Sequence, residues 1–238
     1  MTTPDWLERT SLLMGPDKME RFRRAHVLVV GTGGVGAYAA EMLVRAGIGR
    51  LTLLDADRVQ PSNINRQLCA LHSTVGEEKV RVLGLRFKDI NPELDLTVRA
   101  EFLEEHSAGA LLDSAKFDFI VDAIDTVAPK CALIEGAMKR RIRIVSSMGA
   151  GAKTDITQIR FADLWETFHC GLSKAVRTRL KRDGMGRPLP VVFCAQQADP
   201  AALVQVEGER NKKTTTGTVS YMPAVFGCYL AQYVISRL

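Results

Sequence analysis

Glycines, carboxylates and basic side chains gather at close spacing in the first third of the 238-residue chain. The apolar run His26-Val-Leu-Val-Val30 leads straight into Gly31-Thr-Gly-Gly-Val-Gly36. A strand that ends in glycines lets the backbone approach phosphates, and the helix that opens there points unpaired N–H groups and a positive dipole end at them. On its own, this pattern suits NAD and ATP equally well.

The residues that follow favour ATP. Asp55-Ala-Asp57 comes after the second apolar run Leu51-Thr-Leu-Leu54, and Asn63-Ile-Asn-Arg66-Gln67 and Lys79 come next. An arginine and a lysine a short helix apart suit a triphosphate, whose charge must be neutralised during transfer. A dehydrogenase has no need of them, so a nicotinamide-dependent oxidoreductase is the weakest of the candidate functions.

Each of these side chains also has a plainer interpretation. Asp55 is placed to accept hydrogen bonds from both ribose hydroxyls, and a surface carboxylate is the weaker alternative. Asp57 either orients the loop, holds a metal indirectly or caps a turn. One arginine and one lysine on helices are more often solvated surface charges, but their position after Asp55 reverses that expectation. The glycines expected to meet the nucleotide are Gly31, Gly33, Gly34 and Gly36.

Apolar runs alternate with helical patterns and predict one Rossmann-like, doubly wound α/β domain over residues 1–238, with a helical segment over 1–24. The periodicity predicts strands at 26–30, 51–54, 94–98, 117–121 and 142–146, and helices at 35–46, 79–90, 129–141 and 221–238. The alternating residues 154–161 predict that the mainly parallel sheet continues with antiparallel strands. Residues 195–217 are polar and predict a mobile loop.

Composition argues against a disordered or fibrous chain. Hydrophobic residues make up 46% of the chain and charged residues 25%, which is typical of a folded globular protein. The net charge of +5 favours a polyanionic partner or reflects a merely basic surface. The N-terminus shows no signal peptide, so we expect a cytoplasmic protein. The uncharged residues 214–236 are interrupted by glycine and proline, and predict a buried terminal helix without stable membrane insertion.

The cysteines suggest neither a disulfide framework nor a structural zinc site, because the five of them are scattered and form no Cys-x-x-Cys pair. The histidines show no ligand-like spacing.

The combined pattern resembles the ThiF/MoeB/HesA adenylyltransferase superfamily, which includes ubiquitin-activating enzymes and bacterial enzymes that activate sulfur-carrier proteins. The resemblance covers essentially the whole chain. Within the superfamily, the branch that it most resembles is that of the tRNA threonylcarbamoyladenosine dehydratases, on the basis of Asp122-Ala-Ile-Asp-Thr126, Pro129-Lys130, Met148-Gly-Ala-Gly151 and Asp155-Ile-Thr-Gln158.

The resemblance implies ATP-dependent adenylylation of the carboxylate of threonylcarbamoyladenosine in tRNA, followed by ring closure with loss of water. It also implies a homodimer that uses Mg-ATP. It puts Asn63, Arg66 and Lys79 on the phosphates and Mg²⁺ on Asp125, with Asp122 as a weaker alternative. Arg9, by its spacing to Gly15, matches an arginine that reaches across the dimer interface to the γ-phosphate, although a helix-surface arginine is nearly as good an interpretation.

Other functions remain open. One is an adenylyltransferase for the C-terminal glycine of a ubiquitin-like carrier, and another is a non-catalytic partner in a sulfur relay with a cysteine desulfurase. Family members often carry a sulfur-accepting cysteine where this chain has Thr214-Thr-Thr216, and Cys194 is better interpreted as an inert core thiol than as its substitute. A basic cluster suits either an RNA backbone or a solvated helix: Lys174, Arg177, Arg179, Lys181, Arg182 and Arg187.

Overall fold

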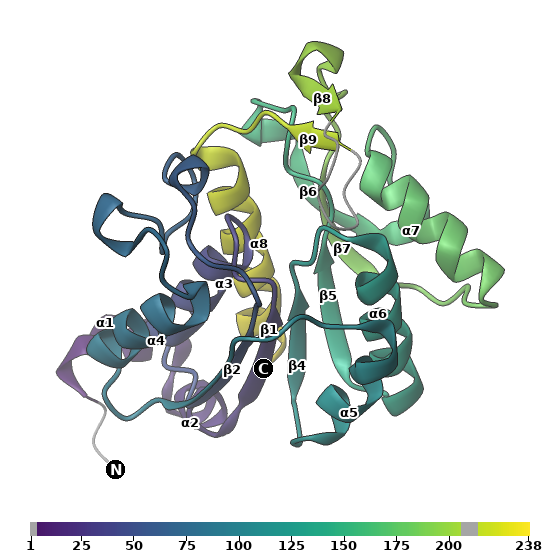
Figure 1. Cartoon of the computed structure of the whole chain (residues 1–238). Coiled ribbons are helices and arrows are strands. Elements are labelled where there is room, and N and C mark those ends of the chain that lie inside the picture. The colour runs from purple at the N-terminus through teal and green to yellow at the C-terminus, as the bar shows by residue number, and fades with distance from the viewer. Residues whose placement is uncertain (1–3, 206–213) are drawn as a thin grey trace.

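The fold is a mixed sheet covered by helices on both faces, shown in Figure 1 as a computed structural model that describes residues 4–205 and 214–238. Strands of the main sheet are β1 His26–Val30, β2 Arg50–Leu54, β3 Asp95–Arg99, β4 Phe119–Asp122, β5 Arg143–Ser147, β6 Ile159–Asp163 and β7 Pro190–Cys194. Their spatial order among the described residues is β3-β2-β1-β4-β5-β7-β6. The predicted α/β class and doubly wound sheet are confirmed.

The central strands are buried on both faces, which explains why they are continuous apolar runs. Parallel pairs join β1 to β2, β1 to β4, β4 to β5 and β5 to β7. Within the main sheet of the described residues, the edge strand β6 alone runs antiparallel, against β7. It begins at Ile159 rather than at residue 154, because the Asp155 carboxylate accepts the Thr157 N–H at 2.9 Å and caps a 3₁₀ turn over Ile156–Gln158.

Helices form a layer on each face of the sheet. They are α1 Glu8–Met14, α2 Pro16–Arg24, α3 Gly36–Arg45, α4 Lys79–Ile90, α5 Ala108–Asp113, α6 Val127–Arg140, α7 Gly171–Arg182 and α8 Tyr221–Arg237. One core contains the apolar faces of α2, α3, α4 and α8, and the other contains those of α5, α6 and α7. The predicted N-terminal helical segment divides at Gly15 (φ +77°), where Pro16 starts α2.

The closing helix α8 packs tightly against α3. A Cβ at Gly227 would lie 2.5 Å from the Val35 carbonyl oxygen, so only glycine permits this close approach. In the described part of the chain, no helix is long and apolar enough to cross a membrane.

The described parts of 195–217 are ordered around the loop that follows β5. β8 Leu203–Gln205 pairs antiparallel with β9 Thr214–Thr216. The Ala152 N–H donates to the Gly217 carbonyl at 2.8 Å, and the Asp199 N–H donates to the Ala152 carbonyl at 2.9 Å. Residues 206–213 lie outside the described residues, so the predicted mobility of this loop stays a prediction.

Candidate nucleotide-binding site

The predicted nucleotide residues meet at the carboxyl edge of the sheet, where β1 lies between β2 and β4. The strand order reverses at this point, because the chain moves outward to β2 and β3 on one side and to β4 and β5 on the other (Figure 1). In open α/β sheets, ligands bind in the crevice outside the carboxyl ends of the strands at such a reversal.

The glycine turn after β1 has no room for side chains at its two ends. Gly31 has φ +85°, and a Cβ there would lie 2.7 Å from the Ala123 carbonyl oxygen. A Cβ at Gly36 would lie 1.8 Å from the Gly31 carbonyl oxygen. The backbone is therefore bare where α3 begins, and the N–H groups of the first turn face the edge of the sheet.

Asp55 shapes this turn from the end of β2. Its Oδ2 accepts the Thr32 backbone N–H at 2.6 Å and the Thr32 hydroxyl at 3.0 Å. Its Oδ1 accepts the Asp57 N–H at 2.8 Å. These bonds fix the carboxylate beside the glycines, in the position that the sequence predicts for a ribose-binding acid.

Lys79 and Asp57 form an ion pair at the start of α4. Lys79 Nζ donates to Asp57 Oδ2 at 2.7 Å, and the Lys79 side chain is 5% exposed while that of Asp57 is 68% exposed. The Lys79 backbone N–H also donates to the Asp57 carbonyl at 3.0 Å. Asp57 therefore holds the predicted phosphate-binding lysine in place.

The segment Asn63–Gln67 covers the glycine turn. The Gln67 amide nitrogen would lie 3.6 Å from a Cβ at Gly33, and the Arg66 carbonyl 3.5 Å from one at Gly34. Gln67 Oε1 is buried and accepts no hydrogen bond from the residues described. An unpaired buried acceptor costs roughly 1–3 kcal/mol, so this oxygen calls for a donor from outside the described residues, either a water or a ligand.

Arg66 and Asn63 make local contacts. Arg66 Nη1 donates to the Ser62 carbonyl at 2.9 Å and to Asn65 Oδ1 at 2.8 Å. The buried Asn63 accepts the Gln60 N–H through Oδ1 at 3.1 Å. The structure thus places the Arg66 backbone beside the glycine turn, while the Asn63 side chain caps the 3₁₀ turn Pro61–Asn63.

The two aspartates at the end of β4, Asp122 and Asp125, differ in their surroundings. Asp122 is fully buried and pairs with Lys130 Nζ at 2.8 Å, while its Oδ2 also accepts the Ser146 hydroxyl at 2.6 Å. Its Oδ1 accepts the Ile124 N–H at 3.1 Å. Asp125 is exposed at the edge. Both carboxylate oxygens of Asp122 are therefore occupied by partners within the chain, and the weaker alternative of Asp122 as the metal ligand is not supported.

Comparisons with known proteins agree with this geometry. The model of the ThiF family matches residues 7–238. The chain belongs to the ThiF family. It is 35% identical over 241 residues to the tRNA threonylcarbamoyladenosine dehydratase of Bacillus subtilis (strain 168), an alignment that covers 97% of this chain and 93% of the relative.

Two further matches cover most of the chain. The tRNA threonylcarbamoyladenosine dehydratase of Haemophilus influenzae is 41% identical, covering 95% of this chain and 90% of the relative. The crystal structure of the E. coli enzyme, TcdA, in complex with ATP matches with a TM-score of 0.89 at 34% identity, covering 100% of this chain and 96% of the other. The chain is thus similar over its whole length to dehydratases of the ThiF family.

Arg9 of this ThiF-family chain lies on the exposed surface of α1. The helix buries no residue, and its neighbours Leu12 and Leu13 are 81% and 80% exposed. The side chain therefore lies on an uncovered apolar face, and the structure does not bring it to the nucleotide site of its own chain.

The residues of the basic cluster on and after α7 fall into two groups, one bonded within the chain and one exposed. Arg177 points inward, donating through Nη1 to the Thr167 carbonyl at 2.8 Å and to the Leu164 carbonyl at 3.2 Å. Arg179 pairs with Glu105 at 2.7 Å and Asp183 at 2.6 Å. The side chains of these two arginines are bonded to acceptors of their own chain, so neither the RNA-binding nor the solvated-helix interpretation applies to them. Exposed members of the cluster are Lys174, Lys181, Arg182 and Arg187.

Sequence reasoning missed two features at this edge. Lys153 is 3% exposed, donates to the Cys194 carbonyl at 2.5 Å, and has a pKa that burial lowers. Phe168 is 42% exposed and contacts His169 edge-on at a centroid distance of 5.0 Å. No spacing in the sequence marks either one. Cys194 is fully buried, as expected of a core thiol.

Proposed function

We propose that this chain is an ATP-dependent tRNA threonylcarbamoyladenosine dehydratase. The observation that carries the proposal is the site at the β1 glycine turn, where Asp55 binds the Thr32 N–H and the Gln67 amide lies over Gly33, with Lys79 held by Asp57 in the loop that follows Asp55. The similarity to dehydratases extends over nearly the full length of both chains. The location that we expect is the cytoplasm.

The reaction needs two steps. A carboxylate oxygen of the threonyl group attacks the α-phosphorus of ATP, and pyrophosphate leaves with the electron pair of the broken P–O bond. The ureido group then attacks the activated carbonyl carbon, AMP departs with the former carboxylate oxygen, and the ureido group loses a proton. Because the second step is intramolecular, with effective molarities of about 10⁵ M or more, adenylylation is the step that the protein must promote.

Each site residue has a role in that first step. The glycines let backbone N–H groups meet the phosphates, Asp55 accepts from the ribose hydroxyls, and Gln67 Oε1 accepts a ligand donor. Arg66 and Lys79 counter the charge that develops as pyrophosphate leaves, and Asn63 adds a neutral donor. Asp57 keeps the Lys79 ammonium in position.

Asp125 is the residue that would hold Mg²⁺. The described residues contain no group of three or more His, Cys, Asp or Glu that could enclose a metal. An exposed single carboxylate fits Mg²⁺, which commonly takes one or two carboxylates together with phosphate oxygens and water. Bound there, the ion would neutralise the phosphates.

A second copy of the chain is the partner that best fits the α1 face. Leu12 and Leu13 are almost fully exposed, and covering them would remove apolar surface from water. A homodimer through this face would also carry Arg9 toward the partner's nucleotide. Sedimentation of Leu12→Glu and Leu13→Glu tests this, since both substitutions should yield monomers.

The decisive experiment is incubation of the protein with tRNA that bears threonylcarbamoyladenosine, with and without Mg-ATP, followed by mass measurement of the nucleosides. We expect loss of one water that requires ATP and is abolished by Arg66→Ala. Unchanged nucleoside, together with ATP–pyrophosphate exchange that depends on a ubiquitin-like carrier, would instead support the sulfur-carrier adenylyltransferase. A sulfur-relay partnership with a cysteine desulfurase predicts binding without either reaction.

A further inference from the structure

An exposed group of aromatic and basic side chains lies beside the start of α7, outside the nucleotide site. The Phe168 ring is 42% exposed, and its edge-on contacts are with His169 at 5.0 Å and Phe193 at 5.4 Å between centroids. The Arg160 guanidinium lies 5.3 Å from the Phe168 centroid and 5.3 Å from the Phe193 centroid. Because Arg160 lies over one face of the Phe168 ring and 42% of the residue stays exposed, the ring and the guanidinium together offer a stacking surface to a ligand.

This group lies at the same edge of the sheet as the nucleotide site. Arg160 pairs in register with Phe193 next to the carboxyl end of β7, and the His169 ring Nδ1 is 3.0 Å from the Ala195 carbonyl just beyond that end. β7 is separated from β4, which leads to Asp125, by β5 alone. With neighbouring strands about 4.8 Å apart, two spacings are roughly 10 Å.

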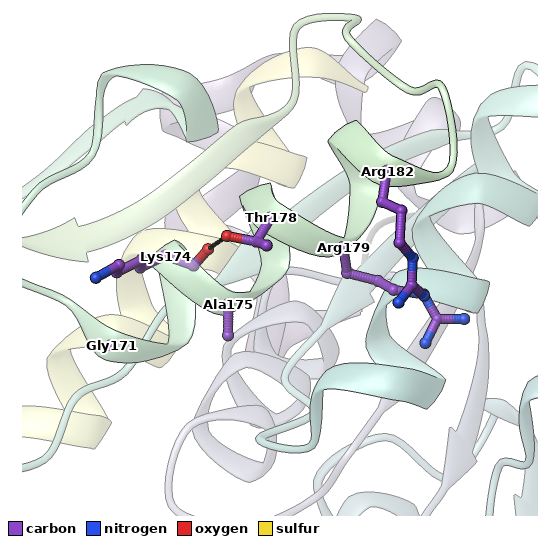
Figure 2. A pocket seen from close by; sticks show the side chains of 6 residues that line it. All are labelled: Gly171, Lys174, Ala175, Thr178, Arg179 and Arg182. Atoms are coloured by element: carbon purple, nitrogen blue, oxygen red, sulfur yellow. Dashed lines mark hydrogen bonds between the residues drawn. The ribbon is translucent and has the colours of Figure 1, made fainter.

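The outer face of α7 continues from this group as a basic surface. Figure 2 shows Lys174 at one end of a shallow hollow and Arg179 and Arg182 at the other, with Ala175 and Thr178 between them. The hollow has a volume of about 410 Å³. Within the described residues Lys174 makes no ion pair. The Arg182 side chain is 67% exposed and donates through Nε to Asp183 Oδ1 at 3.2 Å, which leaves its other guanidinium N–H groups to meet a phosphate.

We propose that Phe168, His169 and Arg160 form a stacking platform for an unpaired RNA base next to the modified nucleotide, and that Lys174 and Arg182 hold the adjoining phosphates. The proposal rests on the proposed function and extends it by assigning the surface that receives the RNA loop.

The chemistry favours single-stranded RNA over other polyanions. Unpaired bases stack on aromatic rings and on guanidinium planes, whereas phosphates are held by exposed lysine and arginine. An acidic peptide would use the basic residues of α7 and leave the Phe168 face unused. A loop nucleotide stacked on the platform also leaves its neighbour near the ATP site, where the carboxylate must react.

The test measures the dissociation constant of an RNA hairpin whose unpaired loop carries threonylcarbamoyladenosine. Base stacking on an aromatic ring is worth about 1–3 kcal/mol, so Phe168→Ala should weaken RNA binding about 5- to 150-fold, and Phe168→Trp should restore it. Lys174→Gln should weaken binding and lower the salt-dependence slope by about 1. ATP affinity, measured by calorimetry, should not change in any of these variants.

Two matched controls separate the platform from general damage. Phe161 is 38% exposed on the same edge strand, but its ring packs against Tyr229 and Tyr233 of α8 on the opposite face, so Phe161→Ala should bind RNA normally. Lys116 is exposed just before β4, at the amino edge, and Lys116→Gln should leave the salt dependence unchanged.

The outcomes distinguish this proposal from the proposed function. If Phe168→Ala and Lys174→Gln bind RNA as tightly as wild type while ATP-dependent water loss continues, the platform is wrong and the function stands. In another outcome, wild type and Phe168→Ala bind RNA with the same affinity, and an acidic peptide displaces the RNA equally from both. That outcome would assign the surface to an acidic protein. If wild type neither binds the hairpin nor modifies it, both proposals fail.

Discussion

The two ends of the Lys79–Asp57 ion pair should respond very differently to substitution. Lys79→Met removes the ammonium and leaves a carboxylate that is 68% exposed, which water can solvate, so the loss of stability should be below about 1 kcal/mol. Asp57→Ala instead leaves an ammonium that is 5% exposed without its acid partner, which should cost about 3 kcal/mol. For a domain of this size, that lowers Tm by roughly 6–12 °C.

The catalytic effects should have the opposite order. Lys79→Met removes a charge that acts on the departing pyrophosphate, and adenylylation should fall about 10²- to 10³-fold. Asp57→Ala keeps the ammonium and should lose less activity at a temperature where it is folded. Urea unfolding and ATP–pyrophosphate exchange in the presence of the RNA substrate measure the two effects separately.

A matched control is Asp113→Ala, whose carboxylate is 64% exposed but whose partner Arg140 is 31% exposed. Because neither end of that pair is buried, stability should not change measurably. The reasoning is refuted if Lys79→Met and Asp57→Ala lose equal stability, or if Lys79→Met keeps full activity.

Other substitutions test the remaining parts of the site. Lys130→Met leaves the fully buried Asp122 without its counter-ion and should lower the free energy of unfolding by about 3–5 kcal/mol. A change below about 1 kcal/mol in urea unfolding would contradict the inference that this ion pair stabilises the fold. Asp125→Asn should raise the Mg²⁺ concentration for half-maximal activity about tenfold or more without lowering Tm in the absence of nucleotide; an unchanged Mg²⁺ titration would remove Asp125 from the metal site. Alkylation at pH 8 should modify the exposed Cys228 before Cys131. Burial raises the pKa of Cys131 to about 12, which leaves roughly 10⁻⁴ of this thiol as thiolate. Peptide mass analysis follows the order of modification, and the reverse order would contradict the prediction.

The sequence was sufficient for the βαβ core, because buried parallel strands must be continuous apolar runs and glycines must end β1. Helix α4 begins and ends where the periodicity predicts it, at Lys79 and Ile90. The start of β6 was missed, since a side-chain cap at Asp155 overrides the alternating pattern. The break at Gly15 was also missed, because helical composition continues on both sides of it.

The sequence could not show that Asp122 is buried in an ion pair while Asp125 is exposed. Asp122 ends β4 and Asp125 follows three residues later, and only the fold shows that Lys130 donates to Asp122 and to the Ile124 carbonyl at 2.9 Å. A lysine in the first turn of a helix looks solvated in the sequence. Arg177 presented the same problem, because its acceptors are carbonyls of a preceding turn.

Among the described residues, three lysines are buried near the carboxyl edge, and they differ in their partners. Lys79 and Lys130 each have an aspartate partner, whereas Lys153, within the described residues, has a backbone carbonyl as its hydrogen-bond acceptor and no carboxylate. Fixed charges in a poorly solvated site stabilise developing negative charge without reorganising. The paired lysines hold the loops after β2 and β4 in shape, whereas burial without a carboxylate partner lowers the pKa of Lys153 and so disfavours its charged form. We therefore expect Lys79, whose ammonium is held by Asp57, to act on the phosphates, and Lys153 to act through its hydrogen bond to the Cys194 carbonyl.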